Sequence, residues 1–278
     1  MKAQLLRGRL TGRPVVEDRR NDDVAVQPEV HTTGPVLRRA ARLLSAFSYD
    51  HPTLTLSELS RRAELPLTTA HRLTAELVAC RFLERDDNDR YHIGIKLWEI
   101  AVLVPQRRTL RDIALPFMED LYQITAQHVQ LAVREGEEAV FIERISGHDV
   151  VPVLSRVGSR FPLHSTGVGR VLLAFAPHDI QEKVLASPIQ QLSPHTVTSP
   201  ADLRRILADV RTSDFAVNDR QVCAETFSVA APIRGPAGEV VAALSIVVAS
   251  EQHASVQALA PVVQATARAV SRSLPQRD

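Results

Sequence analysis

The sequence predicts an α+β chain with two domains, an N-terminal winged helix-turn-helix domain and a C-terminal domain built on an antiparallel sheet, joined by a linker helix. Residues 53–94 have the pattern of two short helices, a tight connection and a hairpin. After residue 128, strand patterns flank turn-forming residues and alternate with helical patterns. With 278 residues, 45% of them hydrophobic, the chain is long enough to bury two cores.

The first 33 residues are expected to be a disordered tail. They mix five arginines with five acidic residues and carry almost no periodic apolar pattern. The arginines could touch DNA, but a solvated extension is favoured. The winged helix-turn-helix domain is expected over residues 34–94. Its first helix opens at Gly34-Pro35, and the apolar face is expected to hold Leu37, Ala40, Ala41, Leu44 and Phe47.

A capping box predicts where the next helix begins. Thr55 can accept from the backbone N–H of Glu58, and the Glu58 carboxylate can reach back to the Thr55 N–H. The helix is expected to end near Ala63, and Pro66 suits the first turn of the helix that follows. Its outward face carries short hydroxyls, an imidazole and a guanidinium, groups that can meet phosphates and base edges in a major groove. These residues are Thr68, Thr69, His71 and Arg72.

A hairpin is expected to complete this domain. Residues 82–85 and 90–93 alternate in polarity around Asp86-Asp87-Asn88-Asp89, a turn-rich tip. This hairpin is the predicted wing, and Arg90 on it is counted with the four helix residues as a DNA-binding residue. Each piece alone also fits a solvated helix or an ordinary hairpin, but their order indicates binding to double-stranded DNA.

The distribution of charge is modestly asymmetric. The whole chain has a net charge of only +1. Residues 37–108 hold twelve Lys and Arg against nine Asp and Glu, whereas residues 109–278 hold fifteen against eighteen. The positive excess on the predicted DNA-binding domain is small, so binding is expected to need several copies on one operator. We therefore expect a homodimer or a dimer of dimers on a palindromic or pseudo-palindromic site.

Composition excludes several other classes of protein. The two cysteines, Cys80 and Cys223, are far apart and belong to no CxxC or Cys/His pattern, so neither a disulfide framework nor a metal site is expected. No cofactor is predicted. No apolar run approaches a membrane span of about 20 residues, and the N-terminus lacks the apolar core of a signal peptide. The expected location is the cytoplasm, away from membranes.

Residues 95–108 are expected to form the linker helix. Ile95–Val104 is an apolar helical run that ends before Pro105 and is too apolar to stand alone in water. A contact between two copies of the chain is the favoured explanation, and packing on its own domain is the alternative.

The second domain is expected over residues 109–278. Helices are expected at 107–125, 166–176, 179–186, 201–212 and 253–274. Hairpins are expected where residues 129–134 and 139–145 flank Glu135–Glu138, and where residues 227–233 and 240–248 flank Gly235–Gly238. A strand is expected at 150–157, and Val217 is placed on a short one.

Two features of this domain suit a small ligand. Ser165-Thr166-Gly167 precedes a helical pattern, so free N–H groups and the positive end of the helix dipole could hold a carboxylate. An ordinary N-cap by Ser165 or Thr166 is the alternative, favoured on these residues alone. Ser228 and Ser245 stand in otherwise apolar strands that are expected to pair, and buried hydroxyls need a partner.

Several stretches together resemble the IclR family of bacterial transcription regulators. They are the helix pair and wing, the apolar linker, PLHSTGVGRVLLAF at 162–175 and AAPIRGPAGEVVAALSI at 230–246. The resemblance covers residues 36–274. It implies a GAF-like effector-binding domain, dimers or dimers of dimers, and control of catabolic operons.

The resemblance also implies which residues hold an effector. A carboxylate is expected on the backbone amides of Ser165, Thr166 and Gly167 and on the side chains of Ser228 and Ser245. The loop from Asp219 to Glu225 is expected to rim this pocket, and Asp219 is counted as an effector-binding residue. The chain departs from the family at Ser228, where Cys is frequent, at Gln221, where an acidic residue is frequent, and at Glu225, where Gly is frequent. The effector therefore need not be the small keto acid that some relatives bind.

The expected function is a DNA-binding transcription regulator whose operator binding responds to a small organic acid, with repression favoured over activation. One alternative is a small-molecule enzyme with an accessory winged helix, using His164-Ser165 or Cys223 as a nucleophile. No G-x-S-x-G, HExxH, Walker or GxGxxG motif supports it, and no catalytic residue is predicted. The other alternative is a winged helix used only for contact with proteins.

Overall fold

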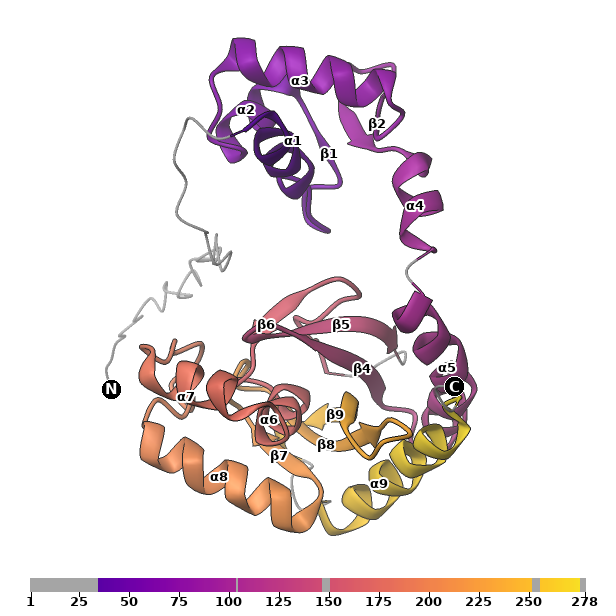
Figure 1. The fold of residues 1–278 in the computed structure, drawn as a ribbon, viewed down its shortest axis with the longest axis vertical. Helices are drawn as coiled ribbons and strands as arrows, with labels where there is room; N and C mark the ends of the chain where they lie inside the picture. The colour runs from indigo at the N-terminus through magenta and orange to yellow at the C-terminus, as the bar shows by residue number, and fades with distance from the viewer. Residues whose placement is uncertain (1–34, 104, 147–150, 252–255, 276–278) are drawn as a thin grey trace, which may run out of the picture. The chain divides into compact units, whose positions relative to one another are not determined.

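The computed structural model describes residues 35–103, 105–146, 151–251 and 256–275. The predicted tail at 1–33 lies outside them. The chain divides into two compact units, Met1–Glu99 and Ile100–Asp278, and each is described by itself (Figure 1). In the described part of the chain, no helix has both the length and the apolar character needed to cross a membrane.

The N-terminal unit is a winged helix-turn-helix, as predicted. Three helices pack with a small antiparallel sheet in the strand order β1-β3-β2. The elements are α1 (Val36–Ser45), β1 (Thr53–Leu54), α2 (Leu56–Arg62), α3 (Leu67–Ala79), β2 (Leu83–Arg85) and β3 (Tyr91–Ile93). The capping box forms as expected, because Thr55 Oγ1 accepts from the Glu58 N–H and the Thr55 N–H donates to the Glu58 carboxylate.

The apolar face predicted for the first helix is correct at Ala40, Leu44 and Phe47, which pack against the core, and wrong at Leu37 and Ala41. Leu37 is 84% exposed and Ala41 is exposed, whereas Leu43 is fully buried. The inward positions of α1 are therefore Ala40, Leu43 and Leu44, which make one helical stripe, and Phe47 joins the same core just after the helix ends. Leu43 was missed because two stripes rich in apolar residues run side by side on this helix.

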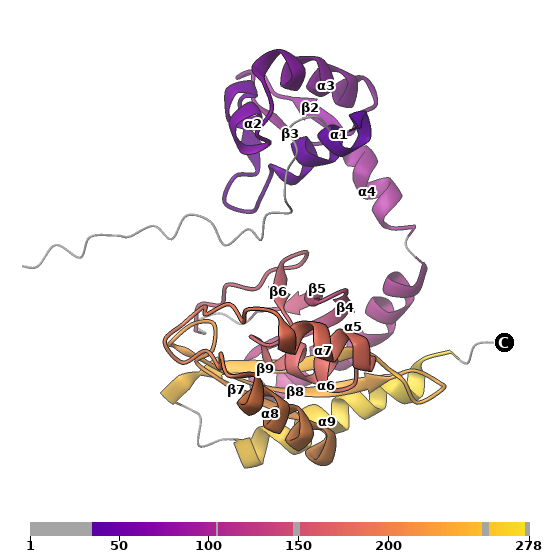
Figure 2. The same cartoon turned by 60° about the vertical axis from the view of Figure 1, so that its left-hand side comes forward.

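The C-terminal unit contains a six-stranded antiparallel sheet with helices on both faces (Figures 1 and 2). Its strand order is β6-β5-β4-β9-β8-β7. The strands are β4 (His128–Glu135), β5 (Glu138–Ile145), β6 (Arg160–Pro162), β7 (Ala216–Asp219), β8 (Thr226–Arg234) and β9 (Val240–Ala249). The helices are α5 (Pro105–Thr125), α6 (Gly167–Ala174), α7 (His178–Ala186), α8 (Pro200–Ser213) and α9 (Val256–Ser273).

Strand alternation sends successive side chains to opposite faces of this sheet. Leu131 and Val229 pack under α5 and α9, whereas Ala132 and Ala230 pack under α6, α7 and α8. Gln130, Ser228 and Ser245 have the parity of the second set, and they face the α6 side. Both predicted hairpins are present, with Gly136 and Gly238 at positive φ in their turns.

The strand predicted at 150–157 is wrong. The described part, residues 151–157, is irregular, and the short strand β6 follows it. Pro152 has no N–H to give to a ladder. Two carbonyl groups of the segment accept from side chains instead, that of Val151 from His128 at 2.7 Å and that of Ser155 from Arg144 at 2.5 Å.

The linker expected as one helix over 95–108 is divided. Helix α4 (Ile95–Ala101) is followed by a turn, and α5 begins at Pro105. A proline is tolerated in the first turn of a helix but not in its interior without loss of a hydrogen bond. Pro105 therefore starts a new helix.

Candidate ligand cavity and nucleic-acid interface

The outward face of α3 carries the predicted DNA-binding residues. Thr68, His71 and Arg72 are exposed and Thr69 is half-buried, while Ala70 and Leu73 of the same helix are buried. The helix starts directly after Pro66, so its first N–H groups and the positive end of its dipole lie beside these side chains. Within the described residues, Arg72 forms no ion pair, and its guanidinium is available to a phosphate or a guanine edge.

The hairpin tip is acidic and folded on itself. The Asp86 carboxylate accepts from the backbone N–H groups of Asn88 and Arg90 at 2.9 and 2.8 Å, and Arg85 pairs with Asp89 at 2.8 Å. Asp87 and Asp89 are exposed. A tip with this charge is poorly suited to approach a phosphate backbone.

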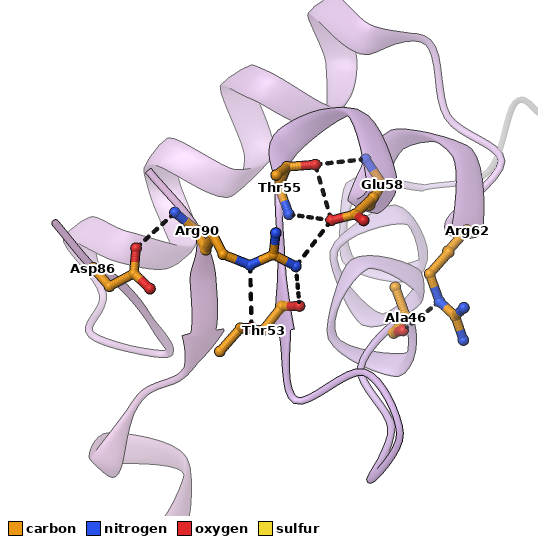
Figure 3. Close-up of polar contacts among 7 residues, drawn as sticks. All are labelled: Ala46, Thr53, Thr55, Glu58, Arg62, Asp86 and Arg90. Carbon is orange, nitrogen blue, oxygen red and sulfur yellow. Dashed lines mark hydrogen bonds and ion pairs between the residues drawn. The ribbon is translucent and has the colours of Figure 1, made fainter. Parts of the chain in front are cut away.

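Arg90 already has partners inside its own unit, as Figure 3 shows. Its guanidinium donates to the carbonyl oxygen of Thr53 at 2.9 Å, to the Thr53 hydroxyl at 3.2 Å and to the Glu58 carboxylate at 3.3 Å. The Thr55 N–H and hydroxyl lower the pKa of Glu58, and the charge of Arg90 adds to this effect. The structure therefore ties Arg90 to the start of α2.

The apolar side chains of α4 are largely exposed in the single chain. None of the helix's residues is buried, and Trp98 is 65% exposed. Ile95 and Ile100 are exposed as well. Exposed apolar patches of this kind are common at interaction sites.

A cavity lies on the α6 face of the six-stranded sheet. Its volume is about 50 Å³, enough for about three or four water molecules. Polar side chains reach it from four strands, the start of α6 and the irregular segment that follows β5; they are Gln130, Ser155, Thr166, Asn218, Thr226, Ser228 and Ser245. Among the described residues that line it, none is Asp, Glu, Lys or Arg.

The start of α6 forms one wall of the cavity. Thr166 is the N-cap, and its hydroxyl accepts from the Gly169 N–H at 3.0 Å. The N–H groups of Gly167 and Val168 belong to the first turn, where a helix supplies no acceptor. Both residues line the cavity. Ser165 does not, because its N–H and its hydroxyl both donate to the Pro162 carbonyl, at 3.1 and 2.8 Å.

Ser228 and Ser245 lie together on the opposite wall. Both line the cavity, and the pairing of Ser228 with Val247 and of Ala230 with Ser245 puts them in diagonal positions on neighbouring strands. Their approach to α6 is close, since a Cβ atom on Gly167 would lie 2.9 Å from Ser228 Oγ.

Asn218 is the lining residue that the sequence did not single out. It pairs with Ser228 across β7 and β8 and is only 6% exposed, yet no partner for its buried Oδ1 exists in the described residues. A buried amide group without a partner is rare in proteins. The predicted neighbour, Asp219, points elsewhere and pairs with Arg220 at 2.9 Å. Neighbouring residues of a strand point to opposite faces of the sheet, so the strand register decides whether residue 218 or residue 219 faces the cavity.

The irregular segment 151–155 covers part of the cavity and is held to β4. His128 Nε2 donates to the Val151 carbonyl at 2.7 Å, and Gln130 Nε2 donates to Ser155 Oγ at 2.6 Å. Burial lowers the pKa of His128, and the charge of Arg144 adds to this, so the imidazole is neutral at neutral pH. Val153 and Leu154 of the same segment line the cavity.

The loop after β7 contributes Cys223 to the cavity rim. The thiol donates to the Glu225 carboxylate at 2.7 Å. Burial raises the pKa of Cys223, and the hydrogen bond to Glu225 adds to the shift, so the thiol is protonated and weakly nucleophilic. Neither this thiol nor Ser165, whose hydroxyl is bonded to a carbonyl, resembles an activated nucleophile.

A helix-turn-helix unit with a free recognition face, followed by a sheet domain with its own small cavity, defines the chain as a DNA-binding transcription regulator. Two family models match it: "Bacterial transcriptional regulator IclR C-terminal" over residues 102–272 and "IclR helix-turn-helix domain" over residues 36–87. The chain belongs to the IclR family and is a regulator, not an enzyme.

Relatives with known names or structures support this assignment. The regulator KipR of Bacillus subtilis is 31% identical over 209 residues, 75% of this chain and 83% of that protein. The repressor AllR of Escherichia coli K12 is 28% identical over 230 residues, 82% of this chain and 85% of that protein. A crystal structure of an IclR homolog from Microbacterium hydrocarbonoxydans, complexed with 4-hydroxybenzoate, has a TM-score of 0.82 and 37% identity and covers 86% of this chain and 99% of that one.

Proposed function

We propose that this chain is a cytoplasmic repressor of a catabolic operon and that a small carboxylate-bearing metabolite controls its affinity for the operator. The observation that carries the proposal is the cavity at the start of α6, where free first-turn N–H groups face the hydroxyls of Ser228 and Ser245 and the buried amide of Asn218. Such a set of donors suits an anion that accepts several hydrogen bonds.

The proposed ligand places its carboxylate against the N–H groups of Gly167 and Val168. Asn218, Ser228 and Ser245 then supply side-chain hydrogen bonds, and Thr166 fixes the helix start rather than the ligand. Because Ser165 and Asp219 already have partners, we assign them supporting roles beside the cavity.

The size of the cavity limits what it admits without a change in shape. A volume of about 50 Å³ is smaller than an aromatic ring needs, since cavities that bind benzene are roughly three times larger. A ligand the size of 4-hydroxybenzoate, which the Microbacterium homolog binds, would require the segment 151–155 to move. That compound and smaller hydroxy acids are the first ligands to try.

At the DNA end, we propose that α3 enters the major groove with Thr68, Thr69, His71 and Arg72. Arg90 is proposed to brace the hairpin against α2 rather than to touch DNA, because Thr53 and Glu58 occupy its guanidinium. Two copies, joined through the exposed apolar side chains of α4, would then present two such helices to a palindromic operator. The repressor name of the relative AllR favours repression.

The proposal is tested by fluorescence anisotropy with DNA from upstream of the chain's own gene and with a scrambled duplex, at two salt concentrations. Sequence-specific binding at both salts, weakened or strengthened by 4-hydroxybenzoate or a smaller hydroxy acid, is the expected result. Binding that ignores sequence at both salts would overturn the regulatory role. Specific binding that no acid changes, together with no small molecule retained by the purified protein in mass spectrometry, would overturn the effector role.

A further inference from the structure

Helix α6 carries a buried cation. Arg170 is only 4% exposed. Its guanidinium donates to the His164 carbonyl at 3.0 Å, to the Val217 carbonyl at 3.2 Å and to Oε1 of Gln221 at 2.6 Å. All three acceptors are neutral, and no carboxylate of the described residues forms an ion pair with it. Burial lowers the pKa of Arg170 to about 10, so it is still protonated at neutral pH.

The guanidinium lies directly behind the cavity wall. The side chain of a helical residue points toward the start of its helix, and the bond to His164 puts the Arg170 guanidinium beside the first turn of α6. Its other two acceptor residues are each followed in the chain by a residue that lines the cavity, Val217 by Asn218 and Gln221 by Val222. One layer of residues therefore separates the charge from the cavity.

The lining itself carries no charge, and the nearby carboxylates are paired or exposed. Asp219 pairs with Arg220, and Glu143 with Arg111 at 2.6 Å. Glu225 is exposed and accepts from Cys223, and Arg144 is half-buried beside Ser155. A buried cation in a medium of low polarisability acts over several ångströms, because little water screens it.

We propose that Arg170 makes the cavity selective for anions, by its charge and without touching the ligand. This inference deepens the proposed effector function and rests on it. A neutral ligand of the same shape meets the same hydrogen-bonding groups but gains nothing from the guanidinium. At a separation of one layer of residues, the charge is expected to favour an acid over its neutral analogue by roughly tenfold or more.

The test compares the dissociation constants of acids and their primary amides by titration calorimetry on the full chain. The pairs are acetate with acetamide, lactate with lactamide, and benzoate with benzamide. Wild-type protein should bind at least one acid roughly tenfold or more tightly than its amide. Equal affinities would overturn this inference alone, whereas no binding by any member of any pair would overturn it together with the proposed effector function.

Variants separate charge from structure. Arg170→Lys keeps the cation and should keep the acid-to-amide ratio, whereas Arg170→Met removes the charge and should lower the ratio several-fold. If Arg170 only held the fold together, both variants would weaken acid and amide alike and leave the ratio unchanged, which would contradict the inference.

A second route keeps Arg170 in place in case Arg170→Met does not fold. Gln221→Glu puts a counter-charge on the guanidinium and should lower the ratio, although the new carboxylate loses the Gln221 donations to His195 and Asp219. Gln191→Glu adds the same charge at an exposed position and is the control. The inference fails if the two glutamates change the ratio equally or if neither changes it.

Discussion

Gly167, the first residue of α6, lies so close to Ser228 on β8 that a Cβ atom at position 167 would be 2.9 Å from the Ser228 hydroxyl oxygen. Gly167→Ala therefore requires the Ser228 side chain to rotate or the start of α6 to move away from the sheet. We expect the free energy of unfolding in urea to fall by about 1–3 kcal/mol. Ligand affinity should fall as well, because the displaced N–H groups of α6 would no longer point into the cavity.

The partner substitution provides the control. Ser228→Ala removes the oxygen, and the nearest remaining atom to the new methyl group is then the Ala230 Cβ at 3.4 Å, an ordinary contact. The double variant should recover most of the stability that Gly167→Ala loses. Strict additivity of the two changes would show that this contact is not the cause.

His128 predicts a pH dependence of stability. Its folded-state pKa is lowered from the ordinary 6.5, chiefly by burial, so the unfolded chain binds the proton more readily than the folded one. The free energy of unfolding should therefore be fully retained above pH 6.5 and decline as the pH falls toward the lower folded-state value. His164 shifts in the same direction for the same cause.

Urea unfolding between pH 7.5 and 5 measures this effect. His128→Gln keeps a donor for the Val151 carbonyl and should make the decline shallower without abolishing it, since His164 remains. His178→Gln, at an exposed histidine on α7, is the control and should follow the wild type. If the free energy of unfolding of His128→Gln fell with pH as steeply as that of the wild type, His128 would not be a source of the pH dependence.

Arg72 is expected to contribute to DNA binding through its charge and its position on α3. Arg72→Ala should weaken operator binding by about 1–3 kcal/mol if it reads a base, or lower the salt slope by about one if it meets a phosphate. Fluorescence anisotropy over a salt series distinguishes the two. Arg205→Ala, an exposed arginine of α8 paired with Asp202, should change neither quantity. Unchanged operator affinity and salt slope for Arg72→Ala would contradict the proposed contact of α3 with DNA.

Arg90 should behave differently from Arg72. Because it joins the hairpin to Thr53 and Glu58, Arg90→Gln should lower the stability of the N-terminal unit by roughly 1 kcal/mol. Operator affinity at low temperature, where the unit stays folded, should remain close to wild type. A loss of operator affinity without a change in thermal unfolding would instead indicate that Arg90 contacts DNA.

The parts of the fold that sequence patterns predicted correctly depend on neighbours in the chain. The capping box of Thr55 and Glu58 spans three residues, and the turn glycines Gly136 and Gly238 lie inside their own hairpins. The segment 151–157 looked like a strand from its β-branched residues. Its shape depends on hydrogen bonds from His128 and Arg144. These residues lie outside the segment, so its local sequence pattern does not show the contacts.

The candidate site was predicted in outline only. Ser228 and Ser245 were recognisable as hydroxyls in apolar strands, and both line the cavity. Asn218 was missed in favour of Asp219, because an error of one residue along a strand reverses the face. Ser165 was included although its N–H and its hydroxyl both donate to the Pro162 carbonyl. The turn that brings these groups together cannot be recognised in the sequence.

All eight residues of α6 are buried, so its side chains are committed to packing, and what it offers the cavity is mainly backbone N–H groups. Backbone groups are the same in every sequence. If regulators of this fold diverge to sense new metabolites, the change has to occur on the surrounding strands, at positions such as 130, 218, 228 and 245, and in the segment 151–155. Evolution of a new response can then proceed by exchanging a few side chains around an anchor that stays in place.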